Sequence, residues 1–364
     1  MSIIDVTSGV SYATLSNAIT DSSANDVIDI SAGSYVEAFP NITHSLSIVS
    51  TGGLAYLSTP SAVPPNGRAI LNVPGDEDVS LSISGLALSG AVDSANNGAG
   101  ILFETGNANL TVLNSWIFGN QDGILTGGVD AASVNGMTVR IDHSELSNNG
   151  VASSNPNYGY DHNLYVNDVT QLTVTDSYFH DALGGHEIKS RALNTIITGN
   201  RIEDGPTSPT SYSIDLANGG NATIANNVIE KGASSVNKYV VHFGGEGTYA
   251  GSSLNISGNT FIDDRPGGAE ALLNQSGDVS GATTPATIDN NTFYGFDPNG
   301  LTQDDYGAPY DSVSDNDFLS LPGPAPDTSH PFDFAVPEPA SAPMLGLAML
   351  AAATVRRIRG WRRR

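Results

Sequence analysis

Short runs in which apolar and polar residues alternate recur along most of the chain. They lie at 110–113, 172–175, 195–198, 223–225, 254–257 and 287–288 and consist of Leu, Ile, Val or Ala beside Thr, Ser or Asn. Such a period of two is typical of a β-strand with one inward face. A second run precedes each of them, at 100–104, 123–126, 162–166, 186–191, 212–216 and 239–243. The pattern therefore predicts many short strands.

A polar residue follows each run of the first kind and marks a repeat. The markers are Ser115, Ser144, Ser177, Asn200, Asn227, Asn259 and Asn291, spaced by 23 to 33 residues. So loose a period excludes helical repeats. Asparagine tolerates left-handed backbone at a bend, and its amide can bond the next coil in a ladder. We therefore predict an all-β chain, a right-handed parallel β-helix with two or three strands per coil.

The beginning of the chain has a different pattern. Residues 12–19 predict a short amphipathic helix, and residues 26–37 predict a strand that follows it. This opening resembles that of pectate-lyase-like β-helix proteins, in which a helix caps the exposed edge of the first coil. The resemblance covers most of residues 1–300, which we expect to be the β-helix. It implies a scaffold that hosts polysaccharide lyases, hydrolases, epimerases, tailspikes and adhesins.

The end of the chain has the layout of a sorting tail. Residues 301–335 are rich in Pro and Asp and predict a linker that would hold the β-helix off a surface. In 336–364, Val336, Pro337, Glu338 and Pro339 precede an uncharged run at 340–355 and six arginines. That run of 16 residues is a little short of the roughly 20 that cross a bilayer. The arginines favour the cytoplasmic side of a single membrane-spanning helix.

This order of motif, apolar run and arginine cluster resembles the PEP-CTERM sorting signal of Gram-negative bacteria. The resemblance implies that an exosortase recognises and cleaves a precursor tethered to the inner membrane, and that the protein reaches the cell surface or the medium. A buried C-terminal helix is the alternative, which the arginines disfavour. Residues 1–6 have neither the basic nor the apolar region of a signal peptide. Export would therefore need a signal upstream of Met1 or one already removed, or else the export hypothesis is wrong.

Charge and composition restrict the partners. The chain has no cysteine and a formal net charge of −24. Without the tail arginines, eight basic residues face 38 acidic ones, which argues against nucleic acid or an anionic membrane as partner. A neutral polymer, such as a polysaccharide, or a metal ion fits this composition better.

Four residues are expected to line up on the outside of successive coils. When Leu164, Ile188, Ile214 and Val241 are aligned as inward residues, the next position outward becomes Tyr165, Lys189, Asp215 and His242. Arg191 lies two residues beyond Lys189 and should share its face. Together they resemble the working parts of a β-helix polysaccharide lyase, which removes a proton next to a uronate carboxylate.

The resemblance to a lyase suggests roles. Lys189 or Arg191 would be the base if its pKa is lowered, and Tyr165 or His242 would protonate the leaving oxygen. Asp215, Glu246 and Arg201 are expected to contact the substrate. A calcium ion on carboxylates such as Asp161, Asp181 and Asp215 could neutralise the substrate carboxylate.

Other interpretations stay open. The row can be an ordinary set of cross-strand ion pairs on a protein that binds or organises exopolysaccharide without catalysis. Asp215 and Glu246 can also be the two carboxylates of a glycoside hydrolase. His162 and His186 are expected to be corner histidines rather than metal ligands. A groove around the row would favour catalysis, and a fully paired row would favour adhesion.

Overall fold

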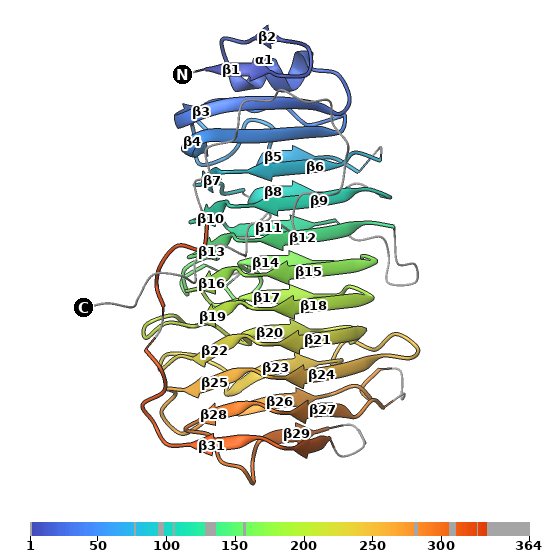
Figure 1. Ribbon diagram of the computed structural model, residues 1–364, viewed down its shortest axis with the longest axis vertical. Helices are drawn as coiled ribbons and strands as arrows, with labels where there is room; N and C mark the ends of the chain where they lie inside the picture. The colour runs from blue at the N-terminus through green and yellow to red at the C-terminus, as the bar shows by residue number, and fades with distance from the viewer. Residues whose placement is uncertain are drawn as a thin grey trace, which may run out of the picture. The chain divides into compact units, whose positions relative to one another are not determined.

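The computed structural model describes residues 2–75, 78–93, 98–104, 106–127, 136–155, 158–279, 283–305, 311–325 and 327–332. The chain divides into two units, Met1–Phe334 and Ala335–Arg364, and every described residue belongs to the first. That unit is a parallel β-helix, in which each strand pairs with the equivalent strands of the coils before and after it (Figure 1). The predicted architecture is confirmed.

Three strands make up each full coil. The first strands form a nine-stranded sheet of β5 (Ala69–Val73), β8 (Ala99–Phe103), β11 (Asp122–Thr126), β14 (Leu164–Val166), β17 (Ile188–Ser190), β20 (Ile214–Leu216), β23 (Tyr239–Phe243), β26 (Glu270–Asn274) and β29 (Thr302–Asp304). The second strands are β6 (Leu81–Ser84), β9 (Asn109–Leu113), β12 (Thr138–Asp142), β15 (Gln171–Thr175), β18 (Asn194–Thr198), β21 (Asn221–Ala225), β24 (Ser253–Ser257), β27 (Ala286–Asp289) and β30 (Ser312–Ser314). The third strands are β7 (Leu86–Ser89), β10 (Trp116–Phe118), β13 (Glu145–Ser147), β16 (Tyr178–His180), β19 (Arg201–Glu203), β22 (Val228–Lys231), β25 (Thr260–Asp263), β28 (Thr292–Tyr294) and β31 (Asp317–Leu319).

The first coil carries the predicted cap. Helix α1 (Leu15–Asp21) follows β1 (Ile3–Asp5) and β2 (Val10–Ser11) and precedes the long strands β3 (Asp26–Val36) and β4 (Leu46–Ser58). The Thr14 side chain accepts a hydrogen bond from the Asn17 amide, a favourable N-cap. The helix buries Leu15, Ala18 and Ile19. Strand β1 pairs antiparallel with β3, whereas the β3–β4 pair is parallel.

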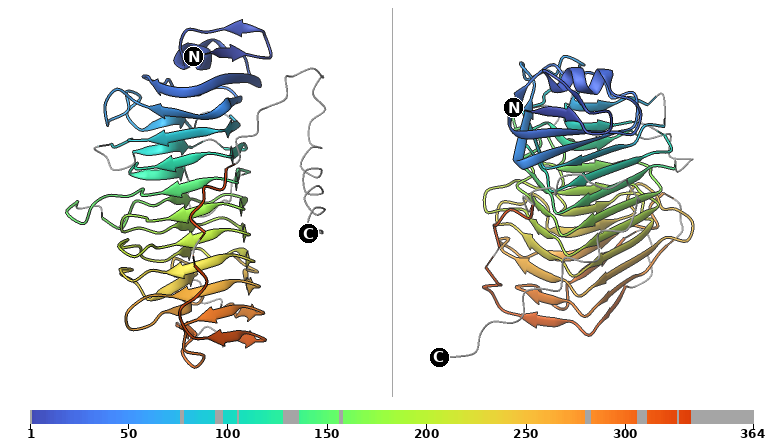
Figure 2. Two further views of the ribbon diagram at one scale, coloured as in Figure 1. Left: turned by 60° about the vertical axis from the view of Figure 1, so that its left-hand side comes forward. Right: turned by 45° about the horizontal axis from the view of Figure 1, so that its top comes forward.

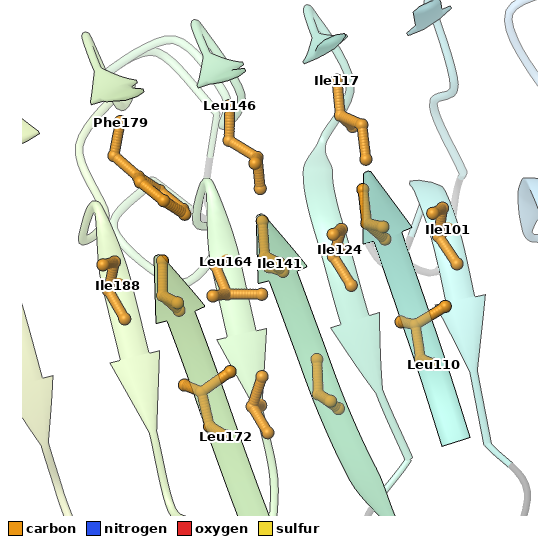
Figure 3. Close-up of a cluster of buried hydrophobic side chains, with 14 of the residues drawn as sticks. Ile101, Leu110, Ile117, Ile124, Ile141, Leu146, Leu164, Leu172, Phe179 and Ile188 are labelled. Atoms are coloured by element: carbon orange, nitrogen blue, oxygen red, sulfur yellow. The ribbon is translucent and has the colours of Figure 1, made fainter. Parts of the chain in front are cut away.

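Inward side chains of equal position stack from coil to coil. Figure 3 shows three such rows inside the coils: Ile117, Leu146 and Phe179; Ile101, Ile124, Leu164 and Ile188; and Leu110, Ile141 and Leu172. All of them are fully buried. Each apolar residue thus covers its equivalent above and below, which is how narrow coils form one continuous core.

Two neighbouring residues form the bend between the second and third strands, and each has a different structural role. The first of them has left-handed backbone, with φ between 47° and 57° at Asn114, His143, Asp176, Asn226, Asn290 and Asp315. The second is the predicted marker, which is buried and bonds the next coil. Asn227 Nδ2, for example, donates to Asn259 Oδ1 at 2.9 Å, and Asn259 donates in turn to Asn291 at 2.9 Å. The ladder is as predicted, but the left-handed residue precedes the marker.

The predicted linker at 301–335 is wrong in its first part. Strands β29, β30 and β31 continue the β-helix to Leu319, and Asn316 accepts the ladder hydrogen bond from Asn291 at 3.0 Å. Phe318 stacks on Phe293 with ring centroids 5.3 Å apart. The sequence Ser314-Asp315-Asn316-Asp317-Phe318 is therefore a further copy of the repeat.

Residues after Leu319 also do not extend away as a spacer. In Figures 1 and 2 the orange-red segment turns back and crosses the third strands from the level of β31 to about that of β10. The predicted sorting tail, 336–364, lies outside the described residues. Within the described ranges there is no helix of sufficient length and apolarity to cross a membrane.

Candidate functional site

The predicted outward row exists. Tyr165 pairs with Lys189 on strands β14 and β17, Lys189 with Asp215 on β17 and β20, and Asp215 with His242 on β20 and β23. Their inward neighbours Leu164, Ile188, Ile214 and Val241 are in register as expected. The four side chains therefore stand side by side on the outer face of the nine-stranded sheet, about 4.8 Å apart.

Asp215 is the buried centre of this row. Its Oδ2 lies 3.1 Å from Lys189 Nζ and 3.4 Å from His186 Nε2, and its Oδ1 bonds His242 Nδ1 at 2.7 Å. Burial opposes ionisation of Asp215, but the hydrogen bond from His242 and the nearby His186 and Lys189 outweigh it and lower the pKa. This carboxylate is therefore a fixed negative charge that orients the three groups beside it, Lys189, His186 and His242.

Glu246 lies on the solvent side of the row and pairs with Lys189 and Arg191. Its Oε1 lies 3.2 Å from Lys189 Nζ, and its Oε2 pairs with Arg191 Nη2. The Glu246 side chain is 44% exposed, against 3% for Asp215. The turn that carries it has left-handed backbone at Gly244 and Gly247, with φ of 89° and 104°, where a side chain would be strained. These glycines let the turn fold back so that Glu246 reaches strand β17.

Arg191 is held by several partners. Its Nε donates to the Tyr165 hydroxyl oxygen at 2.9 Å, and its Nη1 donates to Asn218 Oδ1 at 2.8 Å. Lys189 and Arg191 thus share one face, as predicted, and Tyr165 lies against both: its ring centroid is 5.4 Å from Lys189 Nζ. The side chains of Lys189 and Arg191 are only 12% and 18% exposed.

Neither Lys189 nor Arg191 has the lowered pKa that a catalytic base would need. Burial alone would lower the pKa of Lys189, but Asp215 and Glu246 outweigh it and raise that pKa. For Arg191 the effect of burial is likewise outweighed, by Tyr165 and Glu246, and its pKa is raised. The raised pKa favours the protonated form of both side chains, which suits a partner of anions better than a base.

The proposed hydrolase pair is also unsuited to its role. Asp215 and Glu246 are bridged by Lys189, and the pKa of Glu246 is lowered because Lys189 and Arg191 outweigh its burial. Glycoside hydrolysis needs one carboxyl that is protonated. Because the pKa of Asp215 is lowered too, both members of this pair favour the ionised form in this arrangement.

A stack of flat rings beside the row was not predicted as part of the site. His162 and His186 stack at 4.7 Å between centroids, His186 and Tyr212 at 5.2 Å, and Tyr212 and His242 at 4.7 Å. Burial lowers the pKa of His186 to about 4, and its Nδ1 accepts from the Tyr212 amide at 3.1 Å. The neutral ring therefore carries its proton on Nε2, which faces Asp215. The two histidines are corner residues as expected, but His186 also belongs to the site.

Three predicted residues lie elsewhere. Arg201 is on β19, a third strand, so it faces a different side of the β-helix from Lys189. Asp161, Asp181 and Asp215 do not gather into one group of possible metal ligands. Burial raises the pKa of Asp161 to about 7, Asp181 is bonded to His180, and Asp215 is bonded within the row.

One cluster of possible metal ligands does occur among the described residues, at Asp142, His143 and Asp176. Its buried member, Asp142, is already bonded by Arg140, His143 and Thr175. The sequence-based prediction of calcium therefore gains no support from the side-chain geometry.

Comparison with known proteins agrees with this fold. A family model described as the right handed beta helix region matches residues 127–318, more than half of the chain. The chain belongs to the right-handed β-helix family. A search of curated proteins finds no match. Among solved structures the chain is similar to ORF18 of Geobacillus virus E2, with 15% sequence identity and a TM-score of 0.40. That similarity covers 85% of this chain and 58% of the viral protein, and we draw nothing further from it.

Proposed function

We propose that this β-helix protein binds a carboxylated polysaccharide, a polymer of uronate sugars, along the row from Tyr165 to His242. The observation that carries the proposal is the arrangement of charges around Lys189 and Arg191. Two cations lie on one face, and on the solvent side a single half-exposed carboxylate, Glu246, neutralises both. A uronate carboxylate has the same charge and shape and can replace Glu246 as their partner.

The remaining side chains of the row suit a sugar. The Tyr165 ring gives an apolar surface next to the two cations. The two ring nitrogens of the buried His242 already bond Asp215 and Gln275, so a sugar hydroxyl would have to replace Gln275 there. Because the chain has a formal net charge of −24, long-range repulsion opposes a polyanion. At physiological ionic strength that repulsion is screened beyond about 8 Å, whereas partly buried contacts are screened much less.

Cleavage of the polymer by β-elimination is the second candidate. It is favoured by the hydrogen bond of 2.7 Å between His242 and the buried Asp215, which orients the imidazole. In that reaction a base takes the proton next to the carboxylate, the glycosidic C–O bond breaks, and the leaving oxygen gains a proton as a C=C bond forms. Because the pKa of Lys189 and of Arg191 is raised, we propose that these cations hold the carboxylate and that either Tyr165 or His242 transfers the protons, the two being three strands apart.

One experiment separates binding from cleavage. The protein is incubated with polygalacturonate, alginate and a neutral glucan, while retention of each polymer and ultraviolet absorbance of the unsaturated product are followed. We expect polyuronates to bind and the glucan not to bind, with binding at least about tenfold weaker in Lys189→Ala and in Arg191→Ala. Lys238→Ala is the matched control, because Lys238 pairs with Glu270 away from the row. Retention of no polyuronate would refute the proposed function, and a rise in absorbance would establish a lyase.

The sequence tail supports a proposal about location. We propose that the protein is exported and sorted to the cell surface through the PEP-CTERM-like segment, with Val336, Pro337, Glu338 and Pro339 as the recognised motif. Export fits a ligand that is an extracellular polymer. Cell fractionation of the protein and of a Pro337→Ala, Glu338→Ala, Pro339→Ala variant tests this: the variant should stay in the membrane fraction.

A further inference from the structure

The segment that returns along the β-helix makes side-chain contacts with one row of third-strand residues. We call residues 327–332 the strap. Arg201 Nη2 on β19 donates to the Ser329 carbonyl oxygen, and its Nη1 lies 3.5 Å from Asp327 Oδ1. His330 Nδ1 pairs with Glu145 on β13. Phe332 is buried against Ala87 on β7 and Leu54 on β4. The strap therefore crosses successive coils at a steep angle to the strands (Figure 2).

The surface beneath the strap has a distinct composition. Strands β10, β13, β16 and β19 carry four residues in register, namely Trp116, Glu145, Tyr178 and Arg201. Together with Phe118, which stacks on Trp116 at 4.0 Å between centroids, they form what we call the strap face. The Arg201 guanidinium lies over the Tyr178 ring at 4.2 Å from its centroid. Aromatic rings flanked by one cation and one carboxylate are thus aligned along the axis of the β-helix.

A buried polar group lies under this surface. The Tyr178 hydroxyl donates to Glu203 Oε2 at 2.7 Å, while Glu203 Oε1 is buried and has no hydrogen-bond partner. Glu203 is only 5% exposed. An unpaired buried carboxylate oxygen costs free energy unless a donor reaches it. The third strands thus carry an acceptor that the chain's own side chains leave unused, beside Tyr178 and Arg201.

The contacts of the strap itself are weak. Asp327 is 72% exposed and His330 is 54% exposed. Water therefore competes for the strap member of each ion pair, although Arg201 and Glu145 are largely buried. The Phe332 side chain is the main apolar anchor, the His330 ring packs between Trp116 and Phe332 at 5.3 and 4.9 Å between centroids, and the other contacts are polar. A ligand with more contacts to the strap face can therefore displace it.

We propose that the strap face is a second binding site for carboxylated polysaccharide and that the strap occupies it in the absence of that ligand. A uronate carboxylate would replace Asp327 on Arg201, and sugar hydroxyls would replace His330 as donors to Glu145. Sugar rings would stack on Trp116 and Phe118, whose faces are apolar. The linear path of the strap across the coils is the path that a polymer chain would take. This site lies on the third strands, separate from the row on the nine-stranded sheet.

A spin label on the strap tests the proposal in the full chain. The protein has no cysteine, so Thr328→Cys provides a single labelling position on an exposed strap residue. Polygalacturonate or alginate should convert the label from restricted to mobile motion in a saturable way, and a neutral glucan should not. Asp327→Asn and Phe332→Ser weaken the strap and should lower the polymer concentration for half release, by about threefold or more.

Variants of the first row keep the two sites apart. Lys189→Ala and Arg191→Ala should leave release of the label unchanged, so failure of the proposed function would not affect this result. If no polymer releases the strap in the parent protein or in either weakened variant, the strap is a permanent clamp and the proposal is wrong. Dimerisation of the strap variants without polymer binding would also contradict it, since the face would then take a second copy of the chain.

Discussion

At the residue scale, the bend before each third strand shows why two neighbouring positions differ in sequence. The left-handed position takes Asn, Asp, His or Gly, which tolerate positive φ, and the next position takes Asn or Ser. The marker must bond the coils above and below while fully buried. Asn227 does so by donating to the Ile197 carbonyl oxygen and to Asn259, and by accepting from Asn200. The sequence predicts the ladder because the left-handed backbone at one position and the buried hydrogen bonds at the next each restrict which side chain can occur there.

Replacing one ladder residue should therefore be costly. Asn227→Ala leaves buried backbone and amide partners unpaired and should lower the free energy of unfolding by about 2–4 kcal/mol. Urea denaturation followed by circular dichroism measures this. Asn221→Ala is the matched control, because Asn221 is exposed on strand β21 and should change stability by under about 1 kcal/mol. Equal effects of the two substitutions would contradict a stabilising ladder.

His180 gives the stability a dependence on pH. Its Nδ1 bonds Asp181 at 2.7 Å and its Nε2 bonds Glu145 at 3.3 Å. Burial alone would lower its pKa, but these carboxylates raise it from 6.5 to about 9. Since the folded pKa is above the unfolded value, the contribution is complete below pH 6.5 and is lost as the pH rises through about 9.

A loss of stability between these pH values is therefore expected, of at most about 3 kcal/mol from this residue. His180→Gln should make the urea midpoint less dependent on pH across the same range. His44→Gln is the control, since His44 contacts the Ser22 hydroxyl rather than a carboxylate. An unchanged pH profile in His180→Gln would show that its ion pairs do not contribute.

At the element scale, register explains which parts of the site could be predicted. Period two fixes which side chains of β14, β17, β20 and β23 face outward, so the order Tyr165, Lys189, Asp215 and His242 follows from the sequence. The partner Glu246 lies in a turn, and no periodicity gives the course of a turn. The sequence-based prediction places Arg201 in the site, but Arg201 directly follows the marker Asn200 and so belongs to a third strand. The last coil was missed because Pro and Asp around it hide the repeat at 314–318.

Helix α1 is the element that protects the first coil. Leu15 is fully buried where α1 joins the core, so Leu15→Ala should cost about 2–5 kcal/mol and loosen the cap. An exposed edge of β-strand can pair with another chain, so the variant should also aggregate at lower concentration. Light scattering during mild heating measures this, with Asn17→Ala on the exposed side of the helix as control. Aggregation at the same temperature as the parent would indicate that α1 is not a protective cap.

At the scale of the whole molecule, repeated coils turn single residues into long outward rows. One row, on the nine-stranded sheet, gathers Lys189 and Arg191 in a chain with few basic residues. A second row, on the third strands, carries Arg201 and is covered by the strap. Both rows place cations where carboxylates of the same chain already neutralise them. Under the proposed function, binding of an acidic polymer would be an exchange of carboxylates, and without ligand the cations would not be left as unpaired buried charges.

The most direct test of this account is the affinity of Glu246→Gln for oligogalacturonate, measured by calorimetry. If Glu246 is an exchangeable partner of Lys189 and Arg191, its neutralisation removes the solvent-side carboxylate from both cations while Asp215 still pairs with Lys189, and the variant should bind the oligomer at least about fivefold more tightly. Glu270→Gln, which breaks the Lys238 pair outside the row, should bind like the parent protein. Equal or weaker binding by a folded Glu246→Gln variant would contradict the central claim, because Glu246 would then be a structural partner and not a stand-in for the ligand.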